Sequence, residues 1–393
     1  MRIALEHISE VLKILDGALK ANASMAGNYA GLLADKLERS GEREDALRIR
    51  DRLARAPSAM AFAQDGSRMA TAVPTDTESR LETVDISYPP LQENGFHLPS
   101  AAAKRVQEFI GSVSNYDRLA AAGVASVNRL FLYGPPGTGK TMTARWLASK
   151  LALPLATVRC DTLISSLLGQ TSRNLRRVFD FAEQTPCVLL LDEFDALASA
   201  RGNERDVGEL QRIVIALLQN IDALPGQTVV VAATNFAQGI DPAVWRRFPF
   251  QIPFAVPDAS LREALWKTML RDFAPASLHW DELVSFSEGI SGAVIEQVCQ
   301  DAIRTAILAG QSEADTTEIL RRLGLAISLL NGHHLPSIED EVRWLRQWRG
   351  EAFSLRELAR LYAVSTRQIS NMLRGPNAGK TACKTTKRSG KPR

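Results

Sequence analysis

The sequence has few cysteines and no long run of apolar residues. Four cysteines lie far apart among the 393 residues, and none pairs with another at the spacing of a metal site. No apolar run approaches the roughly 20 residues that cross a bilayer. The start, MRIALEHISE, is interrupted by charges and lacks a signal-peptide core. We therefore expect a cytoplasmic protein with reduced thiols and no membrane-spanning segment.

Neither sign of charge dominates the chain as a whole. Lys and Arg together number 47, Asp and Glu 44, and the formal net charge is +3. After Gly375, however, six basic residues occur without a single acid, so residues 376–393 carry +6 and the remainder −3. Such a basic tail is typical of chains that contact polyanions. Its charge is equally consistent with a disordered end exposed to solvent.

Apolar residues at helical spacing predict a helical module over residues 1–56. Residues 57–94 then turn to Ala, Ser, Thr and Pro without sustained periodicity, which predicts a linker or an extended arm. The first helix of the module places five apolar residues at this spacing: Ile8, Val11, Leu12, Leu15 and Leu19.

Residues 95–257 have the pattern of an α/β domain. Short apolar runs such as RLFLYG, CVLLLDEFD and TVVVAATN alternate with longer helical segments, which indicates β-α units around a parallel sheet. After Pro257 only helical patterns follow, and they predict a helical lid over 258–332, a further helical cluster over 333–375 and the basic tail over 376–393. The lid helices are expected at 260–271, 280–287, 291–309 and about 315–330.

The segment LFLYGPPGTGKTMTARWLASK has the context of a Walker A loop, between an apolar strand and a helical run. Glycines let backbone N–H groups converge on phosphate oxygens, and the following helix N-terminus favours negative charge. We expect Lys140 to reach the β- and γ-phosphates of ATP and Thr141 to offer a hydroxyl to Mg²⁺. A glycine-proline turn that merely precedes Lys-Thr is the alternative. The predicted nucleotide contacts are Gly134, Pro135, Pro136, Gly137, Thr138, Gly139, Lys140, Thr141 and Met142.

Two further strands end in polar residues that suit hydrolysis. VLLLDEFD ends a buried strand with Asp192 and Glu193, and acids at the carboxyl end of a parallel strand line the ligand crevice. Asp192 is expected to hold Mg²⁺ through water and to contact the nucleotide site, and Glu193 to act as general base. Asn235 follows the strand VVVAAT, and we expect its side chain to orient the attacking water between the nucleotide and the general base. An acidic helix cap and an asparagine in a turn are the structural alternatives.

The ordered set GPPGTGKT, VLLLDEFDAL, VVVAATN, DPAVWRRF and SEGISGAVIEQVCQDA resembles the AAA branch of the AAA+ ATPases over roughly residues 95–330. The resemblance implies a P-loop NTPase core of α/β class with a helical lid, and ATP and Mg²⁺ as cofactors. It makes Asn235 the sensor-1 residue. It also matches Gly292 and Ala293 to the glycine-alanine sensor-2 motif near the adenine.

In the resembling family, arginines after the fifth strand reach the active site of the neighbouring subunit. This implies that Arg246 and Arg247 act in trans on the ATP of the next chain, as part of a homo-oligomer that the family builds as a hexamer. Guanidinium groups suit this role because they stay charged and fork onto phosphate oxygens. The alternative is an arginine pair that solvates a surface turn while Trp245, Phe248 and Phe250 pack beneath it.

The resemblance also implies a substrate-gripping aromatic residue in a pore loop, where this chain has Leu167. A leucine offers less contact area and no ring stacking, which weakens the expectation that a polypeptide is threaded. The first functional hypothesis is a remodeller of a protein client. Proteins of this layout also resemble the ATPase partners of subtilisin-like proteases in bacterial anti-phage defence or plasmid-incompatibility operons.

The segment SLRELARLYAVSTRQISNMLRG has the spacing of a helix-turn-helix, with Ala363 where such motifs often have Gly and Ser365 as the expected N-cap of the second helix. The second functional hypothesis is therefore a DNA-bound ATPase in plasmid maintenance, transposition or transcription, contacting DNA through residues 351–393. A three-helix module that docks a protein partner uses the same scaffold. The predicted base-facing residues are Ser365, Thr366, Arg367, Gln368 and Asn371.

Overall fold

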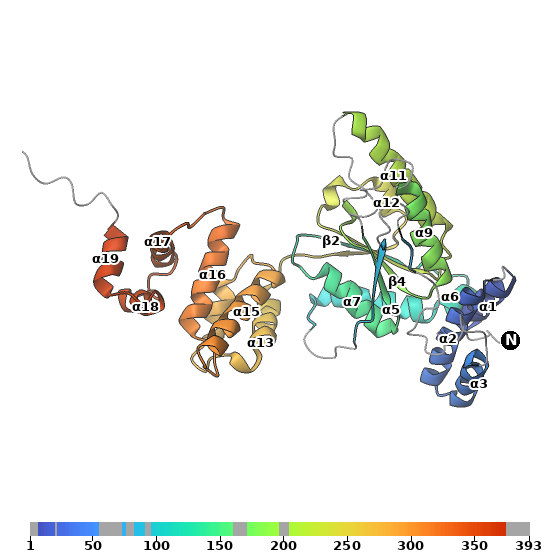
Figure 1. The fold of residues 1–393 in the computed structure, drawn as a ribbon, viewed down its shortest axis with the longest axis horizontal. Coiled ribbons are helices and arrows are strands. Elements are labelled where there is room, and N and C mark those ends of the chain that lie inside the picture. Colours follow the sequence, from blue (N-terminus) through green and yellow to red (C-terminus); the bar gives the residue numbers. More distant parts are fainter. Residues whose placement is uncertain are drawn as a thin grey trace, which may run out of the picture. The chain divides into compact units, whose positions relative to one another are not determined.

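A computed structural model describes residues 7–19, 22–54, 73–75, 82–90, 96–159, 171–195 and 204–374, with the backbone alone for 204–212. The chain divides into two compact units, Met1–Val256 and Pro257–Arg393 (Figure 1). No helix among these residues is long and apolar enough to cross a membrane.

A six-stranded sheet forms the centre of the first unit, in the order β1-β3-β4-β5-β2-β6. Five strands are parallel, as the β-α pattern predicts, but the edge strand β1 pairs antiparallel with β3. The predicted purely parallel sheet is therefore corrected to a mixed one. Strand β1 lies within the predicted linker. The sequence does not predict it, because four residues are too few to show a strand periodicity, and its pairing with β3 defines it. The strands are β1 (Val84–Ser87), β2 (Arg129–Tyr133), β3 (Leu155–Val158), β4 (Val188–Leu191), β5 (Val229–Thr234) and β6 (Phe250–Pro253).

Helices cover both faces of this sheet, and alternate residues of each strand supply the two cores. In β2, Leu130 and Leu132 join the core beneath α5 (Ser100–Ser114) and α7 (Lys140–Leu151). Phe131, between them, joins the core beneath α9 (Thr171–Gln184) and α11 (Glu204–Ala223) on the other face (Figure 1). The short helices α6 (Tyr116–Ala121), η2 (Ala237–Gly239) and α12 (Pro242–Trp245) lie in the connections.

Three helices precede the sheet: α1 (Ile8–Leu19), α2 (Ala23–Ser40) and α3 (Arg43–Ala54). Helix α2 packs at the carboxyl end of α9, where the Tyr29 hydroxyl donates to the Glu183 carbonyl at 3.0 Å. Helix α1 buries polar residues instead of its apolar stripe, because Gly17 allows close approach of α2 and Glu10 pairs with Lys36 at 2.5 Å. The apolar residues left exposed are Val11, Leu12, Leu15 and Leu19.

The second unit is helical, and its first helices agree with the expected segments within two residues. Its last three helices form a small core from Val342, Leu345, Phe353, Leu358 and Ile369. We call α17, α18 and α19 the three-helix unit. The helices are α13 (Ala259–Leu270), η3 (Arg271–Phe273), α14 (Trp280–Phe286), α15 (Gly292–Leu308), α16 (Thr316–Leu330), α17 (Ile338–Trp348), α18 (Leu355–Leu361) and α19 (Thr366–Arg374).

Candidate nucleotide-binding site

The loop between β2 and α7 requires glycine at its first position. Gly134 has a φ of 145°, and a Cβ there would lie 2.0 Å from the carbonyl oxygen of Phe254 after β6. Gly139, with a φ of 97°, is the N-cap of α7 and also adopts a conformation that favours glycine. The loop therefore lies close to β6 and turns directly into a helix N-terminus, a place where backbone N–H groups favour an anion.

Lys140 is buried at the first position of α7. Its Nζ donates to the carbonyl oxygens of Gly134 at 2.8 Å and Pro135 at 2.7 Å. Burial lowers the pKa of Lys140 from its usual value, and the carboxylates of Asp192 and Asp195 oppose that shift. The ammonium group is thus held inside the loop that the sequence predicts to bind phosphate.

Replacing Lys140 by Ala should lower nucleotide affinity by about 100-fold, since a charge-assisted contact to phosphate is lost. Titration with a fluorescent ATP analogue measures this. Lys150→Ala is the matched control, because Lys150 is an exposed lysine near the other end of the same helix. Affinity within threefold of the unchanged protein would contradict the assignment, provided that the melting temperature is also unchanged.

The predicted metal-binding pair comes together in the fold although 51 residues separate its members in sequence. The Thr141 hydroxyl donates to Asp192 Oδ2 at 2.8 Å. A hydroxyl and a carboxylate are the hard oxygen ligands that suit Mg²⁺, which is usually bound by one or two protein groups together with substrate phosphates. Among the residues described, no cluster of three or more His, Cys, Asp or Glu side chains forms a separate metal site. The residues present therefore fit a metal ion held jointly with the nucleotide.

Glu193 follows Asp192 in the left-handed region of the backbone, with a φ of 49°. This conformation is uncommon for a residue with a side chain and is found at functional sites. The Glu193 N–H donates to Asp192 Oδ1 at 2.9 Å, while the Glu193 side chain is exposed. The backbone thus fixes Asp192 and leaves the neighbouring carboxylate open to solvent and substrate.

Asp195 connects the two strand ends of the site, and the sequence assigned it no role. Thr234 Oγ1 donates to Asp195 Oδ1 at 2.8 Å, and the N–H of Asn235 approaches the same oxygen at 3.4 Å. Strands β4 and β5 are neighbours, so this acid holds the end of one against the other. Asn235 is thereby placed beside the acids with its side chain exposed. The sequence signal that could have identified Asp195 is its position as the third acid of LLLDEFD.

The structure separates the two adjacent arginines after α12. Arg247 forms a forked ion pair with Asp222 near the end of α11, with Nε–Oδ1 2.9 Å and Nη2–Oδ2 2.8 Å, and donates from Nη1 to the Ala243 carbonyl. Arg246 is exposed and has no hydrogen-bond or ion-pair partner among the described residues. One guanidinium is therefore held within its own subunit, and the other is available to a neighbour.

Aromatic side chains anchor the turn that carries these arginines. Trp245 packs on Phe131 of β2 with ring centroids 4.8 Å apart, and Phe248 lies 6.3 Å from Phe194, which follows Glu193. Phe250 packs on Phe109 of the opposite core at 5.0 Å. The packing described by the alternative interpretation is present, and it supports the arginine turn from beneath.

The remaining predicted site residues belong to several different segments. Met142 is exposed in the first turn of α7, near a cavity of about 230 Å³ that Tyr88 and Trp146 also line. Gly292 and Ala293 begin α15 of the second unit, and their contact with adenine stays a prediction. Leu167 lies outside the described residues.

The fold and this loop define a P-loop nucleotide-binding domain. Residues 130–256 match the model of the ATPase family associated with various cellular activities (AAA). The chain is 34% identical over 246 residues to an uncharacterized AAA family ATPase, y4kL, of Sinorhizobium fredii, covering 63% of this chain and 74% of that protein. This chain belongs to the AAA family of ATPases.

Two other relatives match this chain over a smaller part of their own length. The cell division cycle protein 48 homolog of Archaeoglobus fulgidus is 36% identical over 213 residues, or 52% of this chain and 29% of that protein. The proteasome-activating nucleotidase of Methanococcus vannielii is 33% identical over 208 residues, or 51% of each chain. The similarity to these two thus spans about half or less of their length.

Proposed function

We propose that this chain is a ring-forming ATPase, of six subunits as in the resembling family, that couples ATP hydrolysis to the remodelling of a protein client. The observation that carries the proposal is Arg246, which is exposed, has no partner among the described residues and lies on a turn anchored to the sheet. An exposed guanidinium on an anchored turn suits an active site that two chains share.

Each site residue has a distinct role in this proposal. Lys140 binds the β- and γ-phosphates, while Thr141 and Asp192 hold Mg²⁺, which neutralises phosphate charge when bound. Glu193 accepts the proton of the attacking water, and Asn235, positioned by Asp195, orients that water. Gly292 and Ala293 lie near the adenine, and Arg246 of the adjoining subunit stabilises the charge that develops on the transferred phosphate.

A protein client is favoured by the name of one relative, the proteasome-activating nucleotidase of Methanococcus vannielii. A subtilisin-like protease partner in bacterial anti-phage or plasmid defence, and a cytoplasmic location, remain part of the proposal. The three N-terminal helices recruit the client or partner. Helix α2 contacts the carboxyl end of α9, so they are fixed to the core that turns over ATP.

Turnover should depend on subunit concentration if the active site is shared. The ATPase rate per subunit, measured over a roughly 1000-fold dilution range, should fall once subunits dissociate. Sedimentation at the same concentrations should show the smaller species where the rate falls. A constant rate per subunit in a sample that sediments as a monomer would disprove the shared site.

A second candidate function is a DNA-bound ATPase. The observation that favours it is the set of exposed polar residues on α19, which six basic residues follow in the sequence after Gly375. Stimulation of turnover by duplex DNA favours this function, and stimulation by a chemically unfolded protein favours the remodeller.

A further inference from the structure

The three-helix unit is fixed to the helix before it. Trp344 Nε1 donates to the Gly324 carbonyl at 2.8 Å, and a Cβ on Gly324 would lie 2.8 Å from Leu345, so α16 and α17 pack at a distance that needs glycine. Arg360 of α18 binds Asp315 at the N-terminus of α16. Helix α19 is therefore presented on a rigid support.

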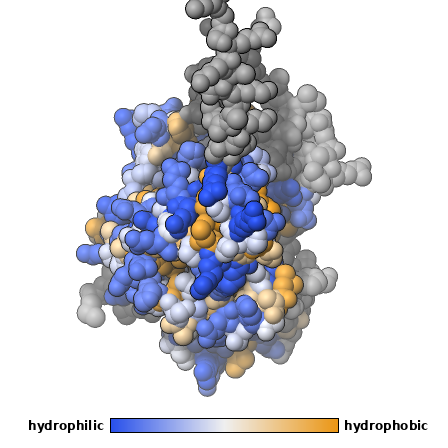
Figure 2. Space-filling model, turned by 90° about the vertical axis from the view of Figure 1, so that its left-hand side faces the viewer, coloured by the Kyte–Doolittle hydropathy of each residue, from blue (hydrophilic) through white to orange (hydrophobic). Residues whose placement is uncertain are grey.

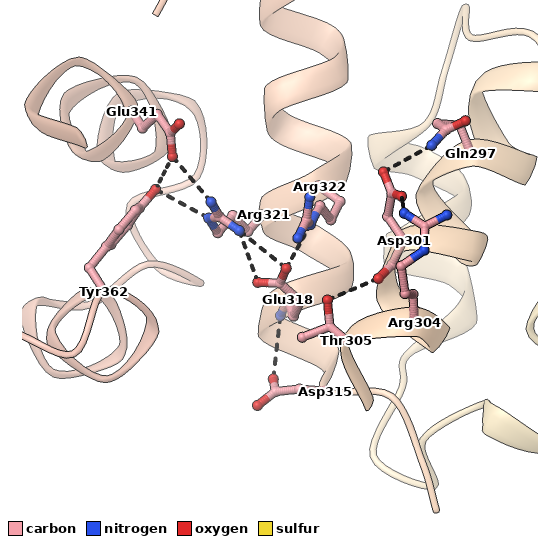
Figure 3. Close-up of polar contacts among 10 residues, drawn as sticks. All are labelled: Gln297, Asp301, Arg304, Thr305, Asp315, Glu318, Arg321, Arg322, Glu341 and Tyr362. Carbon is pink, nitrogen blue, oxygen red and sulfur yellow. Dashed lines mark hydrogen bonds and ion pairs between the residues drawn. The ribbon is translucent and has the colours of Figure 1, made fainter. Parts of the chain in front are cut away.

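Most carboxylates of this region are already paired. Arg321 lies between Glu318 on its own helix and Glu341 of α17, to which the Tyr362 hydroxyl also donates at 2.7 Å (Figure 3). Arg343 pairs with both Glu339 and Asp340, and Arg360 pairs with Glu357. Of the five acids in residues 333–374, Glu351 has no such partner.

Three arginines of the same region have no acid, carbonyl or aromatic ring against them among the described residues: Arg356, Arg367 and Arg374. All three are exposed. On α19, Arg367, Asn371 and Arg374 recur at the i, i+4 and i+7 spacing of one helical stripe. The other side of α19 carries buried Ile369, and the helix contains no acid. The outer stripe is thus cationic, and Figure 2 shows a mostly hydrophilic surface from this side.

The turn before α19 decides which polar side chains are available. Ala363 has a φ of 51°, the conformation for which such turns often use glycine. Ser365 and Gln368 form a reciprocal cap, in which Gln368 Oε1 accepts from the Ser365 N–H at 2.9 Å and Gln368 N–H donates to Ser365 Oγ at 3.3 Å. Of the five predicted base-facing residues, these two are engaged in capping, which leaves Thr366, Arg367 and Asn371.

We propose that Arg356 and the α19 stripe of Arg367, Asn371 and Arg374 form a binding face for duplex DNA that contacts mainly phosphates and tolerates most sequences. The inference rests on the second candidate function and names its surface. Helix α19 suits the major groove, which admits an α-helix. Unpaired arginines suit phosphates, and the six basic residues after Gly375 add to that attraction. Few free base-reading side chains remain, so sequence discrimination should be small.

The test is fluorescence anisotropy with a labelled duplex of random sequence, in the Lys140→Ala background without ATP. The double variant Arg356→Ala/Arg367→Ala should weaken binding at least tenfold and reduce the slope of log affinity against log salt by about 2. The matched control Arg43→Ala/Arg52→Ala removes two exposed arginines of α3 and should stay within twofold. Two unrelated duplex sequences should differ by less than about tenfold.

Unchanged affinity in the double variant, or a salt slope near zero, would overturn the proposal. Displacement of the duplex by poly-glutamate at equal charge concentration would also overturn it, in favour of an acidic protein partner. A second variant, Asn371→Asp, places a carboxylate in the stripe and should weaken binding as well. Because this assay needs no hydrolysis, it separates a failed DNA face from a failed ATPase proposal.

Discussion

Arg246→Ala should reduce ATP turnover by about 10³-fold while ATP affinity changes little. The guanidinium is proposed to act on the transition state in the adjoining subunit, so its loss should lower kcat and leave the binding of ATP by its own loop intact. Steady-state turnover and titration with a fluorescent ATP analogue separate these two quantities. Loss of less than about tenfold in kcat, in a variant that still assembles, would refute the role.

Arg247 and Asp222 supply the control for this prediction. If Arg247 mainly holds the turn through Asp222, then Arg247→Ala should have only a modest effect, whereas Asp222→Ala also removes the carboxylate 3.8 Å from the buried Arg129. Arg247→Ala should cost about 1 kcal/mol of stability at most, because Asp222 is 48% exposed and the pair is screened by solvent. A large loss of turnover in Arg247→Ala alone would show instead that Arg247 leaves Asp222 to act in the neighbouring site.

Glu193→Gln should retain ATP but lose turnover by about 10²–10⁴-fold, the usual range for a general base. The amide preserves the size of the side chain and cannot accept the proton of the attacking water. Single-turnover hydrolysis and ATP titration measure the two effects. Turnover within tenfold of the unchanged protein would mean that another group accepts the proton.

Mixing the two inactive variants tests whether one site uses two chains. An Arg246→Ala subunit keeps Glu193, and a Glu193→Gln neighbour keeps Arg246, so one arrangement of the pair restores a complete site. Random mixing at equal amounts should restore roughly a quarter of the interfaces. Mixed samples as inactive as either variant alone, despite co-assembly, would argue against donation in trans.

Short local patterns were sufficient to predict which residues come together at the candidate nucleotide site. The strand-loop-helix context of Gly134 to Thr141 predicts a phosphate-binding loop, and the acids after VLLL fall at the same edge of a parallel sheet. The contact between Thr141 and Asp192 therefore followed from strand direction. Asp195 was missed because its partner, Thr234, lies 39 residues away and carries no motif of its own.

The apolar periodicity predicts where helices occur better than it predicts which side of each helix is buried. Helix α1 occurs where the apolar spacing indicates it, yet Glu10 and Lys13 are buried and Leu19 is exposed. The sequence predicts a linker where strand β1 lies, because four residues hold too little pattern. In both cases tertiary packing outweighed local preference.

By itself the sequence determined the α/β class, the helical segments that follow it and the types of residue at the phosphate loop and strand ends, because each depends on neighbours a few positions apart. Only the tertiary structure decided which of the two arginines is paired among the described residues, since Asp222 lies 25 residues before Arg247. It likewise decided that the N-terminal helices rest on α9, through a Tyr29–Glu183 contact that spans 154 residues. Long-range contacts of single polar groups leave no periodic trace along a chain, and they set which side chains remain available for function.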